Sequence, residues 1–140
     1  MLYWGMRETA ANRAKLLRRR LFERLVVRAL DGLPPELRAM MDNVEVLIED
    51  EPTAAHLAES DGPNDGDDEL FGLYQGTPLI ERSSSYGMAL PDTITLFRGP
   101  LERACPNQAE LAYQVRVTVV HELSHHVGLD EDRVAALGWA

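Results

Sequence analysis

The chain has one cysteine and no long apolar run, and each scarcity excludes a class of protein. Cys105, the sole cysteine of 140 residues, rules out an internal disulfide and is expected to be a small, partly buried side chain. No stretch approaches the roughly 18 consecutive apolar residues of a membrane-spanning helix. Residues 1–6 are too short for the core of a signal peptide. We therefore expect a cytoplasmic protein with no membrane partner.

Basic residues are also scarce overall. The chain has 14 Lys and Arg against 23 Asp and Glu, a net charge of −9, which argues against general nucleic-acid binding. Half of the basic groups nevertheless fall within residues 13–28. A basic helix face there could touch nucleic acid or anionic lipid, but we favour a solvated face that pairs with the acidic part of its own chain. Nucleic acid is therefore not expected as a partner.

The apolar pattern near the N-terminus predicts a long helix in one domain. Apolar residues make up 45% of the chain, which is enough for a hydrophobic core, and the length suits a single domain over residues 1–140. Residues 8–31 repeat apolar side chains at helical spacing, and Pro34-Pro35 can open a second short helix through about Met41. The expected buried stripe of the first helix consists of Leu17, Leu21, Leu25 and Ala29, with Phe22 and Val26 beside it.

Three segments carry the pattern of strands. Apart from Glu45, residues 44–48 are β-branched or apolar, and Pro52 closes that segment. Residues 70–75 form a second candidate, which residues 78–81 could continue after a turn. Thr93–Phe97 is the third, bounded by turn residues on both sides. The sequence therefore predicts a small sheet.

A polar stretch at residues 59–69 is expected to be a flexible acidic loop. Its aspartates superficially suggest calcium binding. An EF-hand beginning at Asp61 would have Pro63 at its third place and Gly72 at its twelfth, where glutamate is required. We therefore reject a calcium loop.

The residues His121-Glu122-Leu-Ser-His125 match the metal-binding pattern H-E-x-x-H. On an α-helix, residues four apart lie on one face with Cβ atoms about 5–6 Å apart, so both imidazoles could reach one Zn²⁺ at about 2.0–2.1 Å. Glu122 is rotated by about 100° from His121, which places its carboxylate where it can hold a water beside the metal. His121 and His125 are thus predicted zinc ligands, and Glu122 is the predicted general base.

The segment before the motif contains a conflict between helix and strand. Residues 113–119 alternate apolar and polar side chains, as a strand does. On a strand, however, His121 and His125 would lie about 13 Å apart and could not share a metal. We therefore predict a helix from about Asn107 to Val127, followed by a last short helix at residues 131–138.

The third ligand is expected shortly after the motif. The sequence continues through Gly128 in the frame H-E-x-x-H-x-x-G-x-x, and glycine there lets the chain leave the helix and fold back. Beyond His126 no histidine or cysteine follows, which leaves Asp130, Glu131 and Asp132. Position 131 is where the frame puts a ligand, so we favour Glu131. Two histidines and one carboxylate would leave zinc the open position that catalytic sites need.

Several other polar residues are expected to have structural roles. His126 points away from His125 on the helix and is expected at the surface or in support of a ligand, and His56 is expected at the surface. Thr118 lies one turn before Glu122, and core packing is its expected role. Candidates for stabilising an oxyanion, each more consistent with a structural role, are Tyr86, Tyr113 and Arg98.

On these residues the chain resembles the minimal zincin-like metallopeptidases of bacteria, which are short single-domain proteins with an H-E-x-x-H-x-x-G-x-x-D motif. The resemblance runs from about Val44 to the C-terminus and is strongest over residues 90–103, 114–126 and 136–139. It implies a compact α+β fold with N-terminal helices, a small mixed sheet and a C-terminal active-site helix. It also implies zinc on the two motif histidines and Glu122 as general base. The family's third ligand is usually Asp, whereas Glu131 stands in that place here.

The predicted function is that of a zinc-dependent peptidase acting on a peptide or protein substrate, with a zinc-activated water and Glu122 as the base. Thr93–Phe97, as an edge strand, could pair with an extended peptide. One alternative is a non-catalytic zinc-binding interaction domain that uses the basic helix at 13–28. Another is a metal-dependent RNA-processing hydrolase, which the presence of Glu122, the lack of a histidine at 131 and the acidic charge disfavour. The motif selects neither a substrate nor an oligomeric state.

Overall fold

A mixed three-stranded sheet forms the centre of this computed structural model, which describes residues 2–60, 69–76 and 90–127 and, within these ranges, the side chains from Thr9 to His125. Its strands are β1 (Val44–Glu49), β2 (Gly72–Gln75) and β3 (Asp92–Phe97), in the order β1-β3-β2. β3 runs parallel to β1 and antiparallel to β2. The expected mixed sheet is confirmed.

The placement of Thr93–Phe97 as an edge strand is wrong, because β3 is hydrogen-bonded on both sides. Its residues 94–97 are buried, as expected for a strand covered on both faces. The edges of the described sheet are instead β1 and β2. Of these, β2 has the more extensive contact with the helix carrying the H-E-x-x-H motif.

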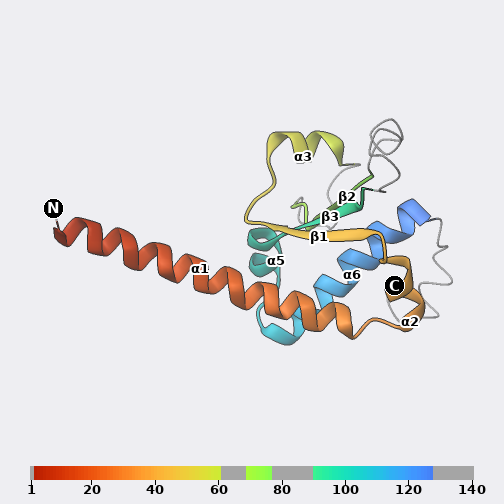
Figure 1. The fold of residues 1–140 in the computed structure, drawn as a ribbon, viewed down its shortest axis with the longest axis horizontal. Helices are drawn as coiled ribbons and strands as arrows, with labels where there is room; N and C mark the ends of the chain where they lie inside the picture. The colour runs from red at the N-terminus through yellow and green to blue at the C-terminus, as the bar shows by residue number, and fades with distance from the viewer. Residues whose placement is uncertain (1, 61–68, 77–89, 128–140) are drawn as a thin grey trace.

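Helices cover the sheet unequally (Figure 1). The long helix α1 (Leu2–Asp31), α5 (Arg98–Ala104) and α6 (Gln108–Val127) pack on the face that presents Ile94 and Leu96, while α2 (Pro35–Met40) packs Leu37 against Val120 of α6. The short α3 (Ala54–Glu59) lies on the other face. Within the described part of the chain, none of the helices combines the length and apolar content needed to traverse a bilayer.

The buried stripe of α1 differs from the expected one. Leu17 and Leu21 are 58% and 54% exposed, whereas Phe22, Val26 and Ala29 are buried against β2, β3 and α6. The helix presents two neighbouring apolar stripes, and periodicity cannot tell which one meets the sheet. The larger Phe22 side chain fills the core. The N-terminal half of α1 projects away from the rest of the chain (Figure 1).

The helical interpretation of the segment before the motif is confirmed. α6 includes all of residues 108–127, so the strand-like alternation did not decide the structure. Val115, Val119 and Leu123 join the main core, and Val120 packs on a second small cluster with Leu37. The valines alternate because α6 is buried on more than one side, not because the segment is extended.

α3 is an element that the sequence pattern did not reveal. Thr53 caps it: the Thr53 hydroxyl accepts a hydrogen bond from the His56 backbone N–H at 3.2 Å, and His56 Nδ1 accepts from Thr53 N–H at 3.0 Å. The His56 ring also lies 5.0 Å from the Phe97 ring, so His56 is a half-buried structural residue. Of the predicted acidic loop, Glu59 belongs to α3, and 61–68 lie outside the described residues, as do the predicted strand at 78–81 and the helix at 131–138.

Candidate metal centre

His121 and His125 lie one helical turn apart near the C-terminal end of α6. Their ring centroids are 4.6 Å apart with the planes tilted by 49°, and both residues are exposed. The Ser124 hydroxyl between them donates a hydrogen bond to the His121 carbonyl at 2.8 Å, which occupies a backbone acceptor near the helix end. Two neighbouring, solvent-facing imidazoles are a donor set that suits zinc.

Glu122 points away from solvent and toward the sheet. It is 8% exposed, and its Oε1 accepts a hydrogen bond from the backbone N–H of Tyr74 at 2.9 Å. In an antiparallel pair, alternate residues direct their N–H groups away from the partner strand. The Tyr74 N–H is therefore on the outer edge of β2, and the candidate general base is held against that edge by a charge-assisted bond to the backbone.

Tyr74 is fixed at its side chain as well as at its backbone. Its phenol donates a hydrogen bond to Asp92 Oδ2 at 2.6 Å, which ties β2 to the first residue of the central strand β3. The ring is largely buried in the main core. These contacts limit the movement of the Tyr74 backbone amide that donates to Glu122.

Gly72 allows α6 to lie close to β2. A Cβ atom on Gly72 would lie 2.7 Å from Thr118 Cγ2, and real Cβ atoms essentially never have a contact this short. Thr118 is buried one turn before Glu122, and Gln114 Nε2 lies 3.5 Å from its hydroxyl. Core packing is thus the role of Thr118, as expected. The lack of a side chain at position 72 sets the spacing at which Glu122 reaches the Tyr74 amide.

Ion pairs hold the chain that enters β2. Arg103 contacts Glu51 with both terminal nitrogens, at 2.9 and 2.7 Å, and reaches Glu69 Oε1 at 2.6 Å. The hydrogen bonds from Arg103 hold the pKa of the Glu51 carboxyl below its usual range. Arg98, considered above for an oxyanion, is engaged by Asp50 at 3.0 Å and by Glu102 at 2.9 Å, so its role is structural.

The remaining predicted residues are not brought to the histidine pair within the described part of the chain. Asp130, Glu131 and Asp132 lie outside it, as does Tyr86, and Tyr113 is exposed two turns before His121. Within residues 2–60, 69–76 and 90–127, no group of three or more His, Cys, Asp or Glu side chains could hold a metal ion. The third ligand therefore stays a prediction.

Three residues of the site were missed by sequence reasoning: Gly72, Tyr74 and Asp92. A signal for the first was available, because glycine inside a strand often marks a close approach of another backbone or helix. No local signal identifies Tyr74, because it takes part through a backbone amide that every residue except proline has. Cys105 is partly buried, as expected.

Comparison with known proteins places these features in a family. A family model described as zincin-like metallopeptidase matches residues 41–139. No curated protein matches. One solved structure, a conserved hypothetical protein from Thermo thermophilus, is similar at 23% identity over 84% of this chain and 96% of its own, with a TM-score of 0.46. The family match spans the sheet, the ion pairs around β2 and the whole of α6, and the chain therefore belongs to the zincin-like metallopeptidase family.

Proposed function

We propose that this chain is a zinc-dependent peptidase in which His121 and His125 bind the ion and Glu122 is the general base. One observation carries the proposal: the exposed imidazole pair and the buried Glu122 carboxylate lie on adjacent sides of the same helical turn. The family match supports a metallopeptidase type of function. Glu131 is proposed as the third ligand because of its place in the motif.

The chain's own groups divide the chemistry between them. When bound, zinc lowers the pKa of a coordinated water to about 7 and polarises a scissile carbonyl. The Glu122 carboxylate takes the proton from the attacking water and delivers it to the leaving amine. The hydrogen bond from the Tyr74 N–H holds this carboxylate in one orientation, so little conformational freedom has to be lost when it acts.

The proposed substrate is a peptide or protein. Thr93–Phe97 was expected to pair with it as an edge strand, but this segment is central and hydrogen-bonded on both sides, so it does not have that role.

The Glu122→Gln variant tests the general base. The amide oxygen of glutamine can still accept the Tyr74 N–H, so the fold and the zinc content are expected to be unchanged, while hydrolysis of a mixed fluorogenic peptide library is lost. Glu110→Gln is the matched control, because Glu110 is an exposed glutamate on the same helix. Full activity of Glu122→Gln would refute the mechanism, and loss of zinc would make Glu122 a ligand.

The double variant His121→Ala/His125→Ala tests the metal site. Both side chains are exposed, so their removal is expected to leave the fold intact and to abolish stoichiometric zinc in elemental analysis. His56→Ala is the control, because that histidine caps α3 far along the chain from the motif. One equivalent of zinc retained in the double variant would overturn the ligand assignment.

A further inference from the structure

The outward face of α1 is basic and apolar together. From Thr9 to Leu21 no described side chain of α1 is buried, and Phe22 is the first that is. A helical segment of about 12–15 residues without packing is only marginally stable in water. The outer α1 face consists of the exposed residues Leu17, Arg20, Leu21, Arg24, Val27 and Arg28. The exposed Glu23, which pairs with Arg19 at 3.4 Å, lies at its border.

The arginines of the outer α1 face are not used by the described part of the fold. Near the middle of α1, Lys15 pairs with Asp50 at 3.5 Å, and Arg19 donates a hydrogen bond to the Ile48 carbonyl at 2.7 Å. Part of the expected pairing between this helix and the acidic region of the chain is therefore present. Arg20, Arg24 and Arg28, in contrast, form no ion pair with any residue that the structure describes.

The charge of the chain is divided between this helix and the rest. Residues 2–31 have eight basic and three acidic side chains, whereas residues 32–140 have six basic and twenty acidic ones. Symmetric pairing of two α1 helices would therefore set arginine rows against each other, which is unfavourable. An occupant of the outer α1 face must supply negative charge.

The apolar residues narrow the choice of anionic partner. At about 100° per residue, Arg28 projects between the directions of Leu17 and Leu21, and Arg20 projects beside Val27. Membrane insertion requires an apolar face separated from the basic one, which this interspersed face lacks. Nucleic-acid contacts go mostly to phosphates and sugars, which leave leucine and valine uncovered. Protein interfaces combine arginine with apolar side chains.

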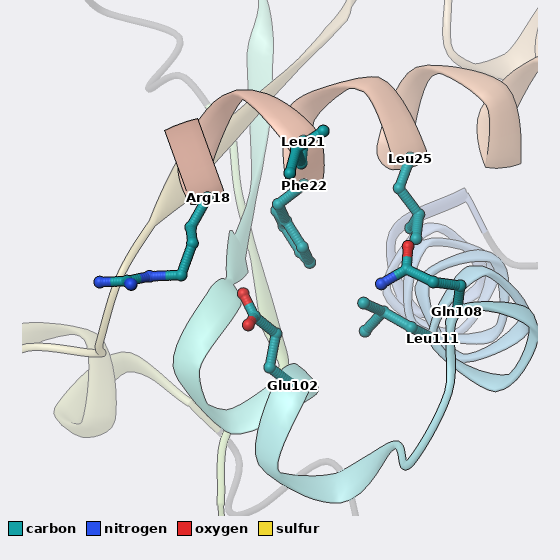
Figure 2. Close-up of a pocket in the computed structure, with 7 residues that line it drawn as sticks. All are labelled: Arg18, Leu21, Phe22, Leu25, Glu102, Gln108 and Leu111. Atoms are coloured by element: carbon teal, nitrogen blue, oxygen red, sulfur yellow. The ribbon is translucent and has the colours of Figure 1, made fainter. Parts of the chain in front are cut away.

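A cavity beside the outer α1 face could receive an apolar anchor (Figure 2). It has a volume of about 120 Å³ and lies between α1, α5 and α6. Its apolar lining includes Phe22, Leu25 and Leu111, and its rim includes Leu21 together with Arg18 and Glu102. Leu21 belongs to both the cavity and the outer face, so the two form one continuous surface.

We infer that the outer α1 face docks an acidic amphipathic segment of a partner protein. Carboxylates of the partner pair with Arg20, Arg24 and Arg28, its apolar side chains cover Leu17 and Val27, and one apolar side chain enters the cavity beside Leu21. The inference is independent of the zinc site, since no residue of the surface belongs to the candidate metal centre.

The test uses a labelled synthetic peptide of glutamate and leucine, with the leucines at i, i+3, i+4 and i+7 so that they share one helix face. A second peptide has the same composition with the leucines distributed around the helix. Binding to the full chain is measured by fluorescence anisotropy at low and high salt. The patterned peptide is expected to bind saturably in the micromolar range, more weakly at high salt, and more tightly than the distributed one.

Matched variants locate the binding. Arg24→Glu and Leu21→Ser are each expected to weaken binding of the patterned peptide by about tenfold, because they remove a charge partner and the anchor contact. Arg38→Glu, an exposed arginine of α2, makes the same change in net charge, and Leu57→Ser removes a similarly exposed leucine of α3. Both controls are expected to stay within about twofold of the unmodified chain.

Several outcomes would overturn the inference. Equal weakening by Arg24→Glu and Arg38→Glu would mean attraction to net charge alone, and absence of saturable peptide binding would mean no docking surface. Tighter binding to phosphatidylserine vesicles or to single-stranded DNA than to the patterned peptide would assign the face to another class of partner. A dimer in sedimentation analysis that Arg24→Glu dissociates would make a second copy of the chain the occupant.

Discussion

Replacing Gly72 by alanine is expected to separate α6 from β2. The added Cβ would lie 2.7 Å from Thr118 Cγ2, 3.2 Å from the Thr95 carbonyl oxygen and 3.4 Å from Leu96 Cδ2. Thr118 and Thr95 are 3% and 2% exposed, so neither can swing into solvent. The φ angle of Gly72 is not in the left-handed region. The cost of the substitution is therefore steric, and it falls on the contact between the strand and the motif helix.

The size of the effect follows from these distances. Relief to an ordinary contact of 3.4 Å requires a displacement of about 0.7 Å at Thr118. Overpacking a core typically costs about 1–3 kcal/mol. Movement of α6 would also lengthen the bond of 2.9 Å between the Tyr74 N–H and Glu122. We expect Gly72→Ala to lower the free energy of unfolding by about 2 kcal/mol.

Thr118→Ser provides a rescue because it removes Cγ2 and keeps the hydroxyl. Alone it should cost about 1 kcal/mol for the lost buried methyl. In the Gly72→Ala background it should instead restore about 1–2 kcal/mol. Urea unfolding, monitored by circular dichroism, gives the free energies of unfolding of the unmodified chain, the two single variants and the double variant. Gly76→Ala is the control, because its Cβ would meet nothing closer than Asp92 Oδ1 at 3.8 Å.

Additive effects of the two substitutions would refute this reasoning, since they would show that Thr118 Cγ2 is not what the alanine meets. Wild-type stability of Gly72→Ala would likewise mean that α6 and β2 are not in close contact. In either case, a close approach of α6 to β2 would not be what holds Glu122 at the strand.

Two further predictions concern the third ligand and the acid stability of the fold. In zinc titrations of three separate alanine variants, the variant at Glu131 should lose tight binding while those at Asp130 and Asp132 keep it; the reverse pattern would mean that the tail enters the site by a different turn. Because Arg103 lowers the pKa of Glu51 from 4.5, their pairing stabilises the fold above that pH and is lost as the pH falls below it. Arg103→Gln should therefore reduce the free energy of unfolding at pH 7 by less than about 1 kcal/mol, since the pair is exposed, and by a smaller amount at pH 3; an equal loss at both pH values would contradict this.

Local spacing predicted the helix that carries the candidate metal ligands. If His121 and His125 are to share one ion they must lie on a helix, and α6 is that helix. The segments at 44–48, 70–75 and 93–97 were also located, because each has strand composition and lies between turn residues. These inferences needed only neighbours within a few residues, which is the range over which a sequence pattern is informative.

Contacts across the chain were not predictable in the same way. Strand order depends on which edges pair over long loops, so the central place of β3 between β1 and β2 in the described sheet appears only in the fold. The choice between two apolar stripes of α1 depended on the shape of the space above the sheet, which Phe22 fills and Leu17 does not. The surplus stripe is the surface for which we infer a partner.

The sequence by itself determined which side chains the candidate site presents: a pair of imidazoles and a carboxylate on one helical turn. Tertiary structure decided where that carboxylate is held. Glu122 bonds to a backbone amide 48 residues earlier, at a strand that Gly72 allows to come close. An amide of this kind is present at nearly every residue, so nothing in the identity of Tyr74 indicates its role. The close approach of a helix and a strand edge selects that amide, and that approach exists only once the chain has folded.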